Sequence, residues 1–117
     1  MTSRMEITER SVGDVTILEL SGRLELDDGD TVFRDAVNRL VDAGRLHLVL
    51  DMAHVTRLDS AGIGMLVSKY LSLTRRGGSM TLFHLTDRAR QLLHITRLDT
   101  VFEIAEHEEQ AVKHGAA

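Results

Sequence analysis

The chain has 117 residues, which fits one domain, and its 14 basic and 18 acidic side chains give a formal net charge of −4. It contains no cysteine, so disulfides, thiolate metal sites and cysteine nucleophiles are excluded, and a cytoplasmic location is expected. The acidic balance and the 3% share of aromatic side chains disfavour nucleic acid as a partner. The chain has neither the apolar core of a signal peptide nor the ~18 apolar residues of a membrane span, so no membrane contact is expected.

The N-terminal part of the chain predicts a β-hairpin followed by an amphipathic helix. Ile7 precedes a turn signal at Gly13–Asp14, and apolar side chains then alternate loosely with polar ones until the second strand ends near Ser21–Gly22. From Asp30 onward, apolar residues recur with the spacing of one helix face, and Gly44 ends this pattern.

The rest of the chain alternates between apolar runs and helical patterns. The run Leu46–Leu50 is almost continuously apolar, as expected of a central strand that is buried on both faces of a parallel sheet. The elements expected after it are a helix from Ser60 to a stop at Gly77–Gly78, a strand at 80–83, a helix from Asp87 to Ile95, a strand at 101–104 and a helix at 108–113. This order predicts an α/β fold: a small, mostly parallel β-sheet with an N-terminal hairpin and about four helices packed on it, in a single domain over residues 1–117.

The stretch Leu58–Gly64 places a serine hydroxyl between a carboxylate and two glycines at the expected start of a helix. One interpretation of Ser60 is an N-cap, whose hydroxyl accepts a hydrogen bond from a free backbone N–H and stabilises the helix by about 1 kcal/mol. Capping does not explain Gly62 and Gly64, each of which costs about 1 kcal/mol relative to alanine inside a helix. Their missing side chains indicate a close approach, either by a loop of the same domain or by a second protein.

A second interpretation is that Ser60 accepts a phosphate. The N-terminus of a helix attracts anions, and phosphorylation would add about −1.5 to −2 charges beside Asp59 at neutral pH. The helix dipole stabilises a negative charge at this position by only ~0.3 to 2 kcal/mol, so the stability of the free domain should change little on phosphorylation. Burying the dianionic phosphate in an interface with a partner that has no matching cation costs several kcal/mol. Ser60 is therefore better suited to switching an association than to switching the fold.

From Glu6 to Val112 the chain resembles the STAS domains, and within them the small anti-sigma-factor antagonists. The resemblance rests on the N-terminal hairpin, on Ser21–Glu25, on Leu48–Asp51 at the end of the apolar strand, and above all on Val55–Gly64. The last stretch matches the family pattern Asp-Ser-Ser/Thr/Ala-Gly-Leu/Ile-Gly. The resemblance implies a single STAS-like domain.

In the family that the chain resembles, the serine after the aspartate is phosphorylated by an anti-sigma factor that is also a serine kinase. The resemblance therefore implies that Ser60 is the phosphate acceptor, and Ala61, which replaces a second hydroxyl common in the family, leaves it as the only one in the motif. Unphosphorylated members bind the kinase and free the sigma factor, and phosphorylated members are released. The implied partners are a kinase-type anti-sigma factor and a metal-dependent serine/threonine phosphatase.

The resemblance also implies a partner-binding surface. Glu25 matches an acidic position of that surface, and Asp59 matches the aspartate beside the acceptor. Asp27, Asp28 and Asp30 make the loop after Glu25 more acidic, which indicates a basic patch on the partner, although these residues also suit a solvated loop that caps a helix. The expected surface consists of Glu25, Asp27, Asp28, Asp59, Ala61, Gly62 and Gly64.

Other chemistries are disfavoured. The nucleophile motif of serine hydrolases needs glycine where Leu58 stands, and neither Gly62 nor Gly64 continues into a phosphate-binding loop. The six histidines show no spacing suited to a metal. We therefore expect no enzyme activity, no catalytic residue, no metal and no cofactor. The alternative function is a non-phosphorylated STAS scaffold or sensory module of a stress-signalling or transport complex, in which Ser60 only caps its helix.

Overall fold

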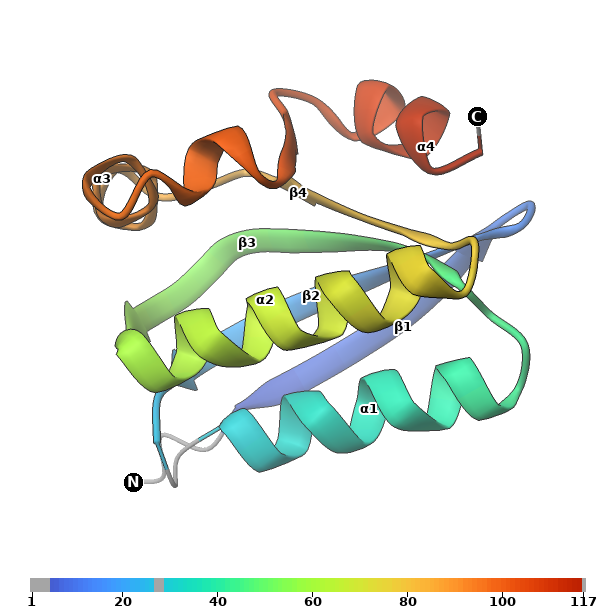
Figure 1. Cartoon of the computed structure of the whole chain (residues 1–117), viewed down its shortest axis with the longest axis horizontal. Coiled ribbons are helices and arrows are strands. Elements are labelled where there is room, and N and C mark those ends of the chain that lie inside the picture. The colour runs from blue at the N-terminus through green and yellow to red at the C-terminus, as the bar shows by residue number, and fades with distance from the viewer. Residues whose placement is uncertain (1–4, 27–28, 117) are drawn as a thin grey trace.

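The computed structural model describes residues 5–26 and 29–116, which form a β-sheet flanked by helices (Figure 1). The elements in chain order are β1 (Glu6–Val12), β2 (Val15–Leu24), α1 (Asp30–Asp42), β3 (His47–Leu58), α2 (Ser60–Arg75), β4 (Ser79–Phe83), α3 (Asp87–Ile95), a 3₁₀ turn (Leu98–Thr100), β5 (Glu103–Ala105) and α4 (Glu108–Ala116). This order confirms the predicted α/β alternation and adds only the 3₁₀ turn.

The described strands form one sheet in the order β1-β2-β3-β4-β5, in which β1 is antiparallel to β2 and the other neighbours are parallel. β3 is therefore the central strand, as predicted. Because the carboxyl ends of parallel strands meet at one edge, the end of β2 lies beside the end of β3, and Leu24 pairs with Leu58. This pairing brings the loop after β2 next to the start of α2.

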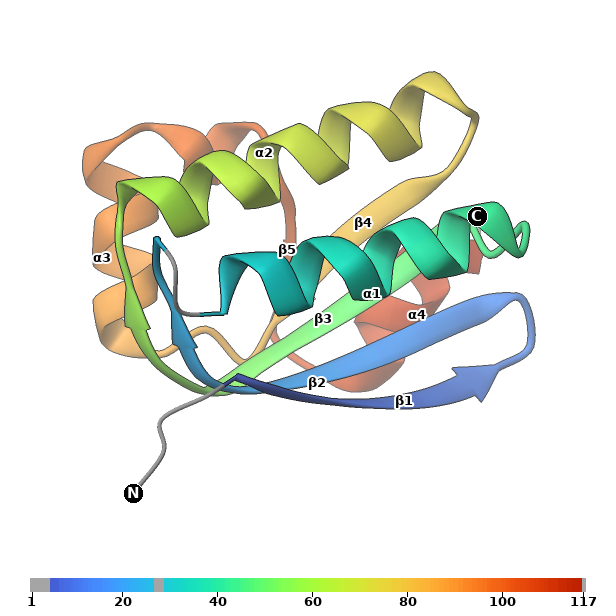
Figure 2. The ribbon, with the colours of Figure 1, turned by 90° about the horizontal axis from the view of Figure 1, so that it is seen from below.

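Helices cover both faces of the sheet. α1 and α2 run alongside each other on one face, and α4 lies on the opposite face (Figures 1 and 2). The larger core contains Phe33 of α1, Leu50 of β3 and Leu66 of α2, all fully buried, and the smaller core joins Val49 to Ala111 of α4. Full burial of a large apolar side chain contributes about 1.5–3 kcal/mol, so α2 has a well-packed support on the sheet.

β2 and β3 both extend beyond the ends that the sequence predicted. β2 continues through Gly22 to Leu24, because a register shift directly after Gly22, at φ 116°, makes this glycine part of a strand irregularity instead of a stop. β3, predicted over 46–50, continues to Leu58, because its polar second half pairs with β2 while Met52 remains buried. The predicted end of β3 was wrong, and the extension of this strand sets the position at which α2 begins.

Candidate functional site

Ser60 is the first residue of α2, where the chain leaves β3 and enters the helix (Figure 1). Its side chain is exposed. Within the part of the chain that the structure describes, its hydroxyl has no hydrogen-bond partner. The hydroxyl is therefore accessible from solvent and is not engaged in holding the fold.

Asp59 is the N-cap of α2. Its backbone is extended, at φ −111° and ψ −176°, and its Oδ1 accepts a hydrogen bond of 2.8 Å from the Gly62 N–H. The interpretation of Ser60 as the cap was wrong, because the cap precedes the first helical residue and Ser60 is already helical. The start of α2 is thus stabilised without the Ser60 hydroxyl.

The second carboxylate oxygen of Asp59 joins α2 to the loop after β2. Asp59 Oδ2 accepts a hydrogen bond of 3.2 Å from the Leu26 N–H, so one carboxylate holds two backbone donors that lie far apart in the sequence. The bond from Gly62 has the largest effect on the pKa of Asp59, and together with the bond from Leu26 it holds this pKa below its usual value against the opposing effect of burial. Asp59 is therefore an ionised link between the two segments.

The two glycines near the start of α2 have different surroundings. A Cβ on Gly62 would lie 2.0 Å from the Leu24 carbonyl oxygen, because the end of β2 packs against the first turn of α2. Gly64 is exposed, and a Cβ there would meet nothing within 4 Å in the described chain. The space at Gly62 is thus filled by the domain itself, whereas the space at Gly64 is open to a second molecule.

Glu25, directly after β2, forms an ion pair with Arg57 of β3, close to the start of α2. Its Oε2 lies 3.1 Å from Arg57 Nε, and its side chain is 22% exposed, compared with 65% for Arg57. Asp30 lies in the first turn of α1, where its Oδ1 accepts a hydrogen bond from the next backbone N–H. The predicted surface residues Asp27 and Asp28 lie outside the described residues. Of the two described acidic side chains, Glu25 and Asp30, Glu25 is the one whose charge is paired with a basic side chain, that of Arg57.

The structure thus brings two segments together at one end of the sheet, the residues after β2 and the junction from β3 to α2. Sequence reasoning missed two members of this region, Leu26 and Arg57. The signal for Arg57 is its basic side chain close to Asp59, but its pairing with Glu25 depends on the parallel alignment of β2 and β3. Nothing local in the sequence marks Leu26 as exposed.

The sequence profile described as the STAS domain matches residues 6–111. The chain belongs to the STAS domain family. The anti-sigma-B factor antagonist of Listeria monocytogenes is 30% identical to this STAS domain over 104 residues, which cover 89% of this chain and 90% of that protein.

Solved structures support the same fold assignment. The crystal structure of an anti-sigma factor antagonist from Mycobacterium paratuberculosis aligns with a TM-score of 0.85 at 19% identity and covers 100% of this chain and 98% of its own. The phosphorylated form of the Bacillus cell fate determinant SpoIIAA aligns with a TM-score of 0.69 at 16% identity, over 94% of this chain and 97% of its own. The predicted STAS fold is therefore confirmed.

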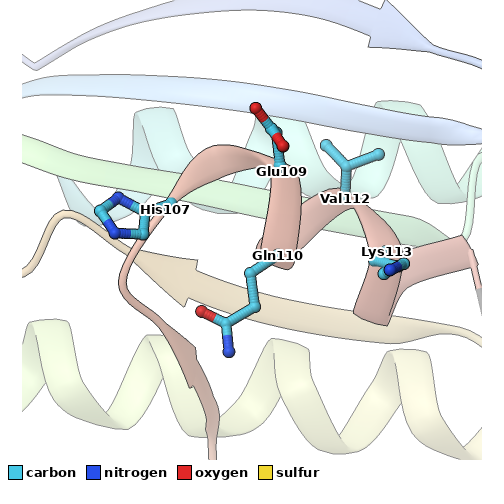
Figure 3. Close-up of a pocket in the computed structure, with 5 residues that line it drawn as sticks. All are labelled: His107, Glu109, Gln110, Val112 and Lys113. Atoms are coloured by element: carbon cyan, nitrogen blue, oxygen red, sulfur yellow. The ribbon is translucent and has the colours of Figure 1, made fainter.

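A hollow of about 640 Å³ lies beside α4 of this STAS domain (Figure 3). The described residues that line it are His107, Glu109, Gln110, Val112 and Lys113, and they include none of the predicted site residues. The described residues also hold no group of three or more side chains placed to bind a metal ion. None of the described helices has the length and apolar character needed to cross a membrane.

The stabilising effect of Asp59 should depend on pH. Because folding lowers the pKa of Asp59, its contribution is fully present above the unfolded pKa of about 3.9 and is lost as the pH falls through the lower folded pKa. Replacing Asp59 with alanine should therefore cost about 1–2 kcal/mol near pH 7. The difference from the wild type should shrink in acid, as measured by urea unfolding across pH 7 to 2.5.

Thr86→Ala is the matched control for this effect. Thr86 caps α3 in the same way, with its hydroxyl accepting a hydrogen bond of 3.1 Å from the Ala89 N–H, but its side chain carries no ionisable group. The cost of Thr86→Ala should be about 1 kcal/mol and should not follow the acid dependence. A pH-independent cost for Asp59→Ala would contradict the stabilisation of the fold by the ionised form of Asp59.

Proposed function

We propose that this STAS domain is an anti-sigma-factor antagonist that switches partners through phosphorylation of Ser60. In its unphosphorylated form it binds an anti-sigma factor that is also a serine kinase, and this binding releases the sigma factor. Phosphorylation of Ser60 releases the antagonist, and a serine/threonine phosphatase regenerates it. The proposed partner surface includes Glu25, Asp59, Ala61 and Gly64, with Gly62 shaping it from within.

The observation that carries this proposal is the exposed Ser60 hydroxyl at a helix start that another residue already caps. A kinase can transfer the γ-phosphoryl group of ATP to the Ser60 Oγ without breaking a contact within the described fold. The bond from the Ser60 Oγ to the γ-phosphorus forms, the hydroxyl proton passes to a base of the kinase, the bond from the γ-phosphorus to the bridging oxygen breaks, and ADP leaves with that oxygen. No step needs a catalytic residue of the STAS domain.

Charge explains how the phosphate would end the association. The phosphate adds about −1.5 to −2 charges next to Asp59, whose carboxylate already occupies the Gly62 N–H of the helix start. In the free domain the phosphate faces water and costs little. Against a bound partner it is desolvated, and an uncompensated cost of about 3 kcal/mol lowers the affinity more than a hundredfold.

The proposal is tested by incubating the protein with the kinase-type anti-sigma factor encoded near its own gene and with ATP, and by locating the phosphate by mass spectrometry. We expect one phosphate, on Ser60, and none on the Ser60→Ala variant. Ser68→Ala is the matched control, because Ser68 is an exposed serine farther along α2, and this variant should be labelled like the wild type.

Two results would contradict the proposal. A wild-type protein without label on Ser60 would favour the alternative of a non-phosphorylated STAS scaffold. Label that persists in Ser60→Ala would place the acceptor elsewhere in the chain.

A further inference from the structure

Leu26 is an exposed apolar side chain at the candidate site. It is 63% exposed, which is unusual for a leucine in a chain whose other leucines mostly lie in the core, and it directly follows Glu25. Ile95, at the end of α3, has a similar exposure of 68% but is not bonded to the junction between β3 and α2. The position of Leu26, and not its exposure alone, distinguishes it.

The backbone on the N-terminal side of Leu26 is held in place. Its own N–H donates to Asp59 Oδ2 at 3.2 Å. Leu24 is fully buried with its carbonyl against Gly62, and Glu25 is paired with Arg57. A side chain presented from a fixed backbone loses less conformational freedom on binding than one on a loose loop, so the position is pre-organised for a contact.

Among the described residues, the two carboxylates that lie closest to Leu26 in the contacts above, those of Asp59 and Glu25, have partners within the domain. The Asp59 carboxylate accepts two backbone hydrogen bonds, and the Glu25 carboxylate faces Arg57. A partner that covers this region therefore does not need to supply a cation for each of these acids. An apolar side chain that a partner covers contributes to the affinity through its buried area, and neighbouring contacts of little energy support it by excluding water.

We propose that Leu26 is the apolar anchor of the partner-binding surface and that the kinase-type anti-sigma factor receives it in an apolar socket beside its phosphoryl-transfer site. This inference rests on the proposed function and adds the chemistry by which the partner is recognised. Asp59 connects the two parts of the surface, because it precedes Ser60 in the chain and binds the Leu26 backbone. The socket therefore lies next to the point at which Ser60 meets the kinase.

The test measures the binding of the full-length, unphosphorylated protein to the kinase-type anti-sigma factor by titration calorimetry. Leu26→Ala should weaken binding at least tenfold, because most of the apolar surface that the partner covers at this position is removed. Ile95→Ala, the matched control with similar exposure, should bind within twofold of the wild type. Both variants should keep the thermal midpoint of the wild type, since neither side chain is buried.

A second variant at position 26 tests whether an apolar side chain of similar size is sufficient for binding. Leu26→Met keeps an apolar side chain of similar size and should bind within about threefold of the wild type. Binding of Leu26→Ala within twofold of the wild type would overturn the anchor while leaving the proposed function intact, as would equal losses in Leu26→Ala and Ile95→Ala. Failure of the wild type itself to bind would overturn the proposed function and this inference with it.

Discussion

Gly62→Ala should destabilise the protein strongly, whereas Gly64→Ala should stabilise it. The Cβ of an alanine at position 62 would lie 2.0 Å from the Leu24 carbonyl oxygen, and that oxygen belongs to the backbone of β2, which cannot turn aside as a side chain can. Overpacking of this kind costs about 1–3 kcal/mol and more where backbone must move, and it outweighs the ~1 kcal/mol that alanine gains over glycine inside a helix.

The matched variant is Gly64→Ala, on the same turn of α2. A Cβ there meets nothing within 4 Å in the described chain, so only the helix preference remains and the variant should gain about 1 kcal/mol. Urea unfolding of both variants measures the difference. Equal midpoints for the two variants would mean that the end of β2 does not press against α2 in solution.

Ser60→Asp should abolish most of the affinity for the kinase-type anti-sigma factor and leave the domain folded. In the free protein the new carboxylate is exposed at the first residue of α2, where the helix dipole favours a negative charge by ~0.3 to 1 kcal/mol. The thermal midpoint should therefore stay within a few degrees of the wild type. At the interface the unpaired charge is desolvated, and binding should weaken at least tenfold, which corresponds to about 1.4 kcal/mol.

Ser68→Asp is the control for Ser60→Asp. It adds the same charge to an exposed serine of the same helix, about 12 Å farther along the helix axis at 1.5 Å per residue. Its affinity for the kinase should stay within twofold of the wild type. Unfolding of Ser60→Asp, or an equal loss of binding in the two variants, would contradict a switch that acts locally at the interface.

The assignment of the helix cap illustrates the limit of sequence reasoning. Asp59 and Ser60 are adjacent and both are favoured N-cap residues, so local preference does not distinguish them. The decision comes from β3, which pairs with β2 as far as Leu58 and keeps Asp59 extended. Ser60 is then the first residue free to become helical. A prediction made without the pairing of β2 and β3 had no means to choose.

The pairing of β2 and β3 also explains why the sequence predicted some features of the candidate site and missed others. The paired glycines predicted a close approach, and the structure separates them into one position packed by β2 and one open position. The acidic side chain of Glu25 was visible in the sequence, but its partner Arg57 lies 32 positions away. The exposure of Leu26 was not predicted, because an apolar residue in a short segment gives no local indication of exposure.

The sequence by itself determined the α/β class, the order of the elements, the resemblance to STAS domains and the choice of Ser60 as the candidate acceptor. These properties follow from apolar spacing and short motifs, which act between residues close in the chain. Only the tertiary structure decided what surrounds Ser60: Asp59 bound to Leu26, which lies 33 positions away, and Gly62 against Leu24. The physical reason is that these contacts exist only once β2 and β3 align in parallel and place their carboxyl ends side by side.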